Sequence, residues 1–119
     1  MTRADVPNRV RACLLEKLPT GEFNKGQVAK ALNFSVRSLH NKLVDAGTSY
    51  QEILDDTRRL LAEQYLRQVA YSVGDVAFLL GFSDFSNFSR AFKRWTGETP
   101  TNYRAHHLGH DPLLETNDQ

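Results

Sequence analysis

The chain has 119 residues, 40% of them hydrophobic, so it is long enough for one compact core and too short for two ordinary domains. Its apolar runs are far shorter than the roughly 18 residues that cross a bilayer, and its N-terminus lacks the apolar stretch of a secretory signal. Its net charge of +1 does not by itself indicate a nucleic-acid partner. We therefore expect a single cytoplasmic domain with no membrane association.

The charges are unevenly distributed along the chain. No acidic residue lies between Glu22 and Asp45, and none lies between Asp84 and Glu98. Basic residues fall inside both of these acid-free segments: Lys25, Lys30, Arg37 and Lys42 in the first, and Arg90, Lys93 and Arg94 in the second. A local excess of cations is what phosphate binding requires, although such a run is often only a solvated face.

The first predicted element is a helix over about residues 6–18. Pro7 lies where its first turn would be, and Pro19 and Gly21 follow its last apolar position. Cys13 is the only cysteine, which excludes an intrachain disulfide and a zinc site built from cysteines, and its neighbours predict core packing. Those neighbours recur every four residues, at Val6, Val10, Leu14 and Leu18.

Two later segments are copies of one unit. The stretch "GQVAKALNFS", from Gly26, aligns with "GDVAFLLGFS", from Gly74, at a constant offset. The alignment continues at a slightly larger offset and pairs Gly47 with Gly97. One supersecondary unit therefore occurs twice in the chain.

Each copy is expected to begin with a capped helix. Asn24 precedes Gln27, and Ser72 precedes Asp75, with the three-residue spacing that caps a first turn. Apolar residues then follow at helical spacing: Val28, Ala31 and Leu32 in the first copy, and Val76, Leu79 and Leu80 in the second.

A tight turn and a second helix complete each copy. The turn positions hold Asn33 and Gly81, the residue types that most readily accept a positive φ. Ser35 and Ser83 follow and are expected to cap the second helices. The two helix-turn-helix units are thus predicted over about residues 24–47 and 72–97.

A long helix is predicted between the copies, over about residues 49–68, with Ser49 as its cap and Glu52 in its first turn. Its apolar stripe is expected at Ile53, Leu54, Thr57, Leu60, Leu61 and Gln64. A short final helix starts after Thr99, with Pro100 at its first position. Periodicity is lost after His107, so residues 108–119 are predicted to form a loose tail.

Two helix-turn-helix units joined by a long helix suit double-stranded DNA, because a second helix can enter a major groove about 12 Å wide. In the second unit, the aromatic residues Phe88, Phe92 and Trp95 are expected to fix that helix to the domain. The opposite face carries Ser86, Ser89, Arg90 and Lys93.

The span from Val6 to His107, and most sharply "SVGDVAFLLGFSDFSNFSRAFKRWTGETPTNYR", resembles the DNA-binding domain of the AraC/XylS family of bacterial transcription regulators. The matching residues are Gly81, Phe82, Phe88, Arg90, Phe92, Gly97, Pro100 and Tyr103. The resemblance implies an all-α, seven-helix domain over residues 1–107, with two helix-turn-helix subdomains joined by a long helix. It also implies binding to adjacent major grooves.

The resemblance further implies which residues face DNA bases: Arg37, His40 and Asn41 in the first unit, and Phe85, Ser86, Ser89 and Arg90 in the second. Spacing agrees for the first set, because residues 37, 40 and 41 share a helical face opposite Leu39 and Leu43. Phe85 departs from the polar residue common in the family, and either contacts a thymine methyl group or packs on its own domain. The acid-free segments predict phosphate contacts from Lys25, Lys42, Lys93 and Arg94.

Other functions find little support in the sequence. A metal site at His106, His107 and His110 is not expected, and neither a cofactor nor an enzymatic activity is predicted, because no nucleophile elbow or phosphate loop is present. The resemblance implies a nucleoid-associated activator that contacts RNA polymerase. We favour a domain excised from a larger regulator, whose N-terminal part would bind an effector or dimerise. The alternatives are a helical protein-interaction module and the DNA-binding part of a repair or recombination protein.

Overall fold

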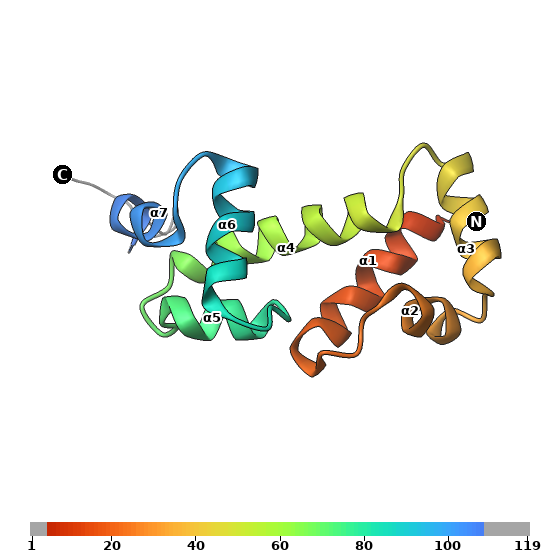
Figure 1. Cartoon of the computed structure of the whole chain (residues 1–119), viewed down its shortest axis with the longest axis horizontal. Coiled ribbons are helices and arrows are strands. Elements are labelled where there is room, and N and C mark those ends of the chain that lie inside the picture. The colour runs from red at the N-terminus through yellow and green to blue at the C-terminus, as the bar shows by residue number, and fades with distance from the viewer. Residues whose placement is uncertain (1–4, 109–119) are drawn as a thin grey trace. The chain divides into compact units, whose positions relative to one another are not determined.

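The computed structural model describes residues 5–108. Within that range the chain forms seven α-helices and one short 3₁₀ helix, with no strand, which confirms the all-α prediction (Figure 1). The chain divides into two compact units, Met1–Arg58 and Arg59–Gln119, which we call unit 1 and unit 2. No helix among the described residues is long and apolar enough to span a membrane. The predicted tail lies, apart from Leu108, outside the described residues.

Unit 1 contains α1 (Val6–Lys17), the 3₁₀ helix η1 (Leu18–Thr20), α2 (Lys25–Ala31), α3 (Val36–Asp45) and the first part of α4 (Tyr50–Leu66). Its core is largely aliphatic and includes Val10, Leu14, Leu18, Val28, Leu39 and Leu43. Cys13 is 8% exposed, as predicted, and burial raises the pKa of its thiol.

Unit 2 contains the end of α4 together with α5 (Val73–Leu79), α6 (Phe85–Thr96) and α7 (Pro100–His107). Its core is aromatic as well as aliphatic, with Ala62, Leu66, Val76, Ala77, Leu80, Phe88, Phe92 and Tyr103 buried together. The two copies of the sequence repeat therefore form the same kind of helix pair, but one pair packs on a largely aliphatic core and the other on a core that also contains aromatic residues.

The predicted caps of α2 and α5 are both present as reciprocal capping boxes. The Gln27 backbone N–H donates to Asn24 Oδ1 at 2.8 Å, and the Asn24 N–H donates to Gln27 Oε1 at 3.0 Å. Ser72 and Asp75 make the equivalent pair at 2.9 and 3.0 Å. Each box satisfies two backbone amides that helix geometry leaves without a partner.

Both turn positions also adopt the predicted conformation. Asn33 has φ 65° and Gly81 has φ 81°, which lie in the left-handed region. After the first turn, Ser35 caps α3 by accepting from the Ser38 N–H at 3.0 Å. The chain thus reverses within a few residues and presents the second helix of each unit.

The cap predicted for α6 was wrong by one residue. Asp84, and not Ser83, is the N-cap, and its Oδ1 accepts from the Asn87 N–H at 2.8 Å. The reason is that α6 begins at Phe85, so the second turn is one residue longer than the first. Ser83 instead accepts from the Asn87 side-chain amide at 3.3 Å.

The apolar stripe of α2 also differs from the prediction. Ala31 is exposed, and Ala29, at 1% exposed, is buried beside Val28. In α5 the matching Ala77 is 4% exposed and buried, while Leu79 is only half-buried. These helices have seven residues each, too few for apolar spacing alone to define the buried side.

In α4 the predicted stripe holds fully only for the first half of the helix, and in the second half Leu61 is partly buried against the core of unit 2. Ile53, Leu54 and Thr57 are buried, as expected, but Leu60 is 49% exposed and Gln64 is exposed as well. Ala62 and Leu66 are buried in their place. Because the first three residues belong to unit 1 and the last two belong to the core of unit 2, one periodicity cannot describe the whole helix.

A partly buried cluster positions the start of α2. The Tyr50 hydroxyl donates to the carbonyl of Phe23, the residue before the α2 cap, and the Arg58 guanidinium lies 4.9 Å from the centre of the Phe23 ring. Burial raises the pKa of Tyr50 to about 12 and lowers the pKa of Arg58. The cluster therefore joins α4 to the first helix-turn-helix unit of the chain.

Candidate nucleic-acid interface

The second helix of the first helix-turn-helix motif, α3, has one buried face and one polar face. Leu39 and Leu43 are 0% and 1% exposed. The three predicted base-facing residues, Arg37, His40 and Asn41, are all exposed. The side chains of Arg37 and Asn41 have no hydrogen-bond partner within residues 5–108. The polar face of α3 is therefore available to a ligand.

Two of the predicted DNA-facing residues of unit 1 lie side by side. Lys25, at the first position of α2, places its Nζ 3.5 Å from His40 Nδ1 on α3. Lys25 is half-buried, whereas His40 is exposed. The capping box of α2 fixes the backbone at Lys25, so the structure brings a predicted phosphate contact next to a predicted base contact.

A further cation, Arg9, which the sequence analysis did not identify, lies near the first turn. Phe34 follows the positive-φ residue Asn33, and its ring has Lys42 Nζ 5.6 Å from its centre and Arg9 Cζ at 5.4 Å. Arg9 also donates to the Leu32 carbonyl at 3.4 Å. Arg9 was missed because it lies on α1, outside both acid-free segments. Cation–π contacts of this kind hold the charges near the turn.

The second helix of the second helix-turn-helix motif, α6, is attached to the core of unit 2 by aromatic residues, as predicted. Phe88 and Phe92 are both 0% exposed, and their ring centres lie 5.8 Å apart. Phe92 also meets the Tyr103 ring of α7 at 5.3 Å with an interplanar angle of 75°. Trp95, by contrast, is only partly buried against this core. A helix attached by such pairs resists rotation about its axis.

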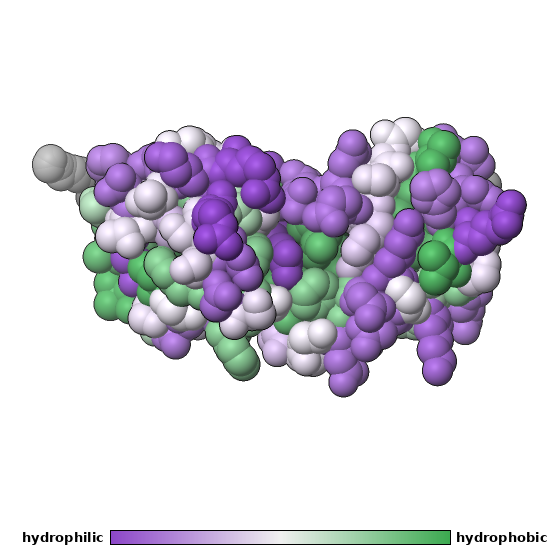
Figure 2. Space-filling model, in the orientation of Figure 1, coloured by the Kyte–Doolittle hydropathy of each residue, from purple (hydrophilic) through white to green (hydrophobic). Residues whose placement is uncertain are grey.

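Polar residues occupy the other face of α6. Ser86, Arg90, Lys93 and Arg94 are exposed, and Ser89 is half-buried. Strongly hydrophilic side chains cover much of the surface that α6 shows in the space-filling view (Figure 2). Lys93 and Arg94, in the last turn, have no ion-pair partner in the described part of the chain. They are therefore free to meet phosphate.

Phe85 packs on its own unit, one of the two roles weighed from the sequence, and is still partly exposed. It is the first residue of α6, it is 43% exposed, and its ring meets Phe88 edge-on at 6.3 Å. The ring thus packs on its own unit while keeping an apolar surface in solvent. Exposed apolar surface at the start of such a helix suits contact with a thymine methyl group.

Arg90 takes part in a hydrogen-bond network that sequence reasoning missed. Its Nη2 donates to Asn87 Oδ1, and the Asn87 amide donates in turn to Ser83 Oγ and Asp84 Oδ2, at 3.3 Å each. The three-residue spacing from Asp84 to Asn87 to Arg90 is the only sequence signal for this chain of contacts. The network places one predicted base-facing side chain on a fixed support.

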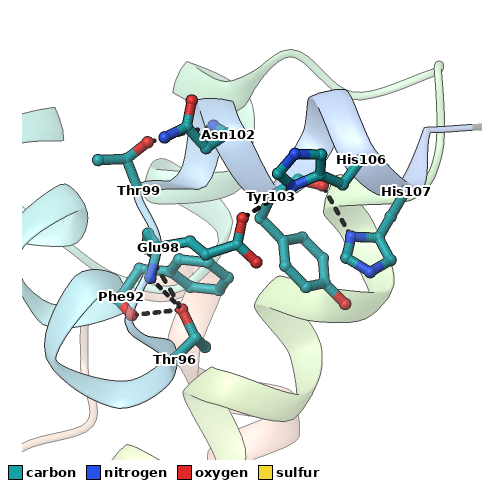
Figure 3. Close-up of polar contacts among 8 residues, drawn as sticks. All are labelled: Phe92, Thr96, Glu98, Thr99, Asn102, Tyr103, His106 and His107. Atoms are coloured by element: carbon teal, nitrogen blue, oxygen red, sulfur yellow. Dashed lines mark hydrogen bonds and ion pairs between the residues drawn. The ribbon is translucent and has the colours of Figure 1, made fainter.

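The histidines near the C-terminus are engaged separately. His106 Nδ1 lies 3.0 Å from Glu98 Oε1, and His107 Nδ1 lies 2.9 Å from the Tyr103 carbonyl oxygen (Figure 3). The His107 ring also stacks on the Tyr103 ring at 4.1 Å. Within residues 5–108, no group of three or more metal-ligating side chains comes together. His110 lies outside the described residues.

Known proteins with similar sequences and structures also contain helix-turn-helix domains. A family profile described as a helix-turn-helix domain matches residues 28–106. The ornithine utilization regulator of Pseudomonas aeruginosa is 47% identical over 97 residues, which are 81% of this chain but only 28% of that protein. The chain therefore spans less than a third of the length of that relative.

Two solved structures have a similar fold. A DNA-binding transcriptional dual regulator from Escherichia coli K-12 has a TM-score of 0.81 at 26% identity, and the match covers 90% of this chain and 96% of that one. The DNA-binding domain of AdpA, solved in complex with a target DNA, has a TM-score of 0.74 at 28% identity and covers 92% and 98%. The chain belongs to the AraC/XylS family of bacterial transcription regulators and carries the helix-turn-helix DNA-binding domain of that family.

Proposed function

We propose that α3 and α6 are recognition helices that each read a major groove of double-stranded DNA in a sequence-specific manner. The observation that carries this proposal is the same division on both helices, with buried apolar residues on one side and exposed polar residues on the other. A helix can present polar side chains to base edges only if its remaining face holds it firmly to the domain.

The base-reading residues are Arg37, His40 and Asn41 on α3, and Phe85, Ser86, Ser89 and Arg90 on α6. An arginine can donate to O6 and N7 of guanine together, and asparagine can pair with an adenine edge. Arg37 and Arg90 therefore discriminate guanine, while Asn41 favours adenine. The serines reach base edges or phosphate, and His40 meets a purine edge beside Lys25.

Phosphate contacts come from Lys25, Lys42, Lys93 and Arg94. Lys93 and Arg94 are exposed in the last turn of α6, and Lys42 is exposed near the end of α3. With four to seven such contacts from the two acid-free segments, the logarithm of the binding constant falls with log salt at a slope of about −4 to −6.

The whole regulator is longer than this chain, because the match covers 28% of the ornithine utilization regulator. Its remaining part binds an effector or dimerises, and the DNA-bound protein activates transcription through contacts with RNA polymerase. Such a regulator works in the cytoplasm on the nucleoid and has no catalytic role. Family membership and the share of the relative that is covered support these features of the proposal.

The test is selection from a randomised duplex pool, with sequencing of the bound fraction. It uses this chain, Arg37→Ala and Arg90→Ala, with Arg11→Ala as the control arginine, since Arg11 lies on α1 outside both acid-free segments. We expect two enriched blocks about one helical turn apart, with each of the first two variants relaxing one block by roughly 1 to 3 kcal/mol. The control leaves both blocks intact.

Three results would contradict the proposal, and the first two concern the binding partner. One is that no sequence is enriched at moderate salt, and the other is that the bound partner is a protein whose affinity shows no steep dependence on salt. The second result would favour the helical protein-interaction module. Relaxation by Arg11→Ala equal to that by Arg90→Ala would show that general charge, and not α6, carries the discrimination.

A further inference from the structure

The side chain of Arg90 is held from within its own helix before any ligand is present. Asn87 lies three residues earlier on the same face, and its Oδ1 accepts from Arg90 Nη2. Asn87 is in turn fixed by both oxygens of the Asp84 carboxylate, one on its backbone N–H at 2.8 Å and one on its side-chain amide at 3.3 Å.

The orientation of the Asn87 amide follows from these contacts. Its Nδ2 group donates to Ser83 Oγ and to Asp84 Oδ2, both on the N-terminal side of the helix. Only an amide whose nitrogen points that way satisfies both acceptors, so its oxygen must face Arg90. The α6 cap thereby sets the direction from which Arg90 is held.

The support leaves the recognition capacity of Arg90 intact. A guanidinium has five N–H donors, and Asn87 engages one of them. The other four make no hydrogen bond to any residue within 5–108. Because Asn87 is neutral, it orders the guanidinium without cancelling its charge, whereas a carboxylate in that place would compete with guanine or phosphate.

We infer that Asn87 is a positioning residue for base recognition: it pre-orders Arg90, so that less side-chain freedom is lost on binding. This inference rests on the proposed function of Arg90. Ordering one long side chain in advance is worth a factor of roughly 2 to 12 in affinity. The gain is confined to the DNA sequences that Arg90 discriminates.

The chain offers a matched control for Asn87. Asn102 occupies the same third position of α7, where its backbone N–H donates to the cap Thr99 at 3.1 Å (Figure 3). Three residues further along is Ala105, so Asn102 has no arginine to hold. Asn102→Ala therefore reproduces the loss of an asparagine from a first helical turn without the loss of an arginine support.

The experiment measures binding to the selected duplex and to single-base variants of it, for the wild-type chain, Asn87→Ala, Arg90→Ala, the double variant and Asn102→Ala. Arg90→Ala defines the base pair that Arg90 reads. We expect Asn87→Ala to weaken discrimination at that same base pair by about 2- to 12-fold. The double variant is expected to lose no more than Arg90→Ala, and Asn102→Ala to lose nothing.

Three outcomes would overturn the inference. Loss at a different base pair that persists in the Arg90→Ala background would make Asn87 a direct reader. An equal loss on all sequences, with a lower free energy of unfolding, would make it only structural. If Arg90→Ala relaxes no base pair although the wild-type chain selects a site, then the assignment of Arg90 fails and its positioning residue fails with it.

A second measurement needs no DNA. NMR order parameters of the Arg90 guanidinium in the free protein report how ordered the side chain is on the picosecond to nanosecond timescale. We expect them to fall in Asn87→Ala and to stay unchanged in Asn102→Ala. Unchanged values in Asn87→Ala would refute the pre-ordering directly.

Discussion

Replacing Arg104 by methionine should destabilise unit 2, because this side chain satisfies three backbone carbonyls at once. From α7 it donates to Leu66 O and to Gln68 O at 3.1 Å each, and also to Tyr71 O. These carbonyls lie at the end of α4 and in the loop that leads to α5. Arg104→Met keeps the aliphatic stem, which packs as before, and removes all of the donors.

The expected magnitude follows from the exposure of each bond. The bond to Gln68 is exposed, so water replaces it at little cost. The bonds to Leu66 and Tyr71 are partly buried, and each is worth about 1 to 1.5 kcal/mol with a charged donor after discounting for solvent. The free energy of unfolding should therefore fall by about 2 to 3 kcal/mol.

Urea unfolding followed by circular dichroism measures this change. Arg94→Met is the matched control, because Arg94 is exposed on α6 and has no hydrogen-bond or ion-pair partner within residues 5–108, so it should alter stability by less than about 0.5 kcal/mol. If Arg104→Met behaves like the control, then water satisfies the three carbonyls equally well, and Arg104 does not hold the α4–α5 loop.

Three further predictions concern other parts of the chain. Burial raises the pKa of Tyr50 to about 12, above its usual value near 10, so the contribution of Tyr50 to the free energy of unfolding is complete below pH 10 and is lost as the pH rises to 12. In urea melts measured over a pH series, Tyr50→Phe should flatten the decrease in stability between pH 10 and 12. Gly97 has φ 88° with open space around it, so Gly97→Ala should cost about 1 to 2 kcal/mol from backbone strain alone, whereas Gly97→Asn should cost less, and an equal cost for both substitutions would contradict this origin. Lys93→Ala should reduce the salt slope of DNA binding by about 1, and Lys17→Ala, on α1, should not; an unchanged slope in Lys93→Ala would remove Lys93 from the phosphate contacts.

The parts of the fold that local chemistry determines could be predicted from the sequence. The capping boxes at Asn24 and Ser72 and the turn residues Asn33 and Gly81 were all identified from residue type and spacing. Each of these features depends only on residues a few positions apart, so residue type and spacing are enough to predict it. The repeat then fixed the order of the helices.

The errors arise where tertiary packing decides between local alternatives. Ser83 and Asp84 are both good cap residues, and the extra residue in the second turn selected Asp84. Leu60 looked like a core residue because a helical stripe was extended past the point at which α4 changes from one core to the other.

The candidate site shows the same limit. Faces could be assigned from spacing, as for Arg37 opposite Leu39, because a helix has a fixed period. Contacts between helices could not be assigned in this way, so Arg9 beside Phe34 escaped prediction. The contact between Asn87 and Arg90 could not be predicted for another reason, since it depends on the orientation of the Asn87 side-chain amide.

The continuity of α4 has a consequence for any attempt to shorten the chain. Unit 1 ends at Arg58 and unit 2 starts at Arg59, in the middle of a helix that runs over Tyr50–Leu66. In a helix each carbonyl bonds to the amide four residues later. A cut at this boundary would therefore remove the hydrogen-bond partners of the last turn in one fragment and of the first turn in the other. The motif is therefore duplicated in sequence, but the chain cannot be divided at this boundary. A fragment that carries only one helix-turn-helix motif would have to include the whole of α4.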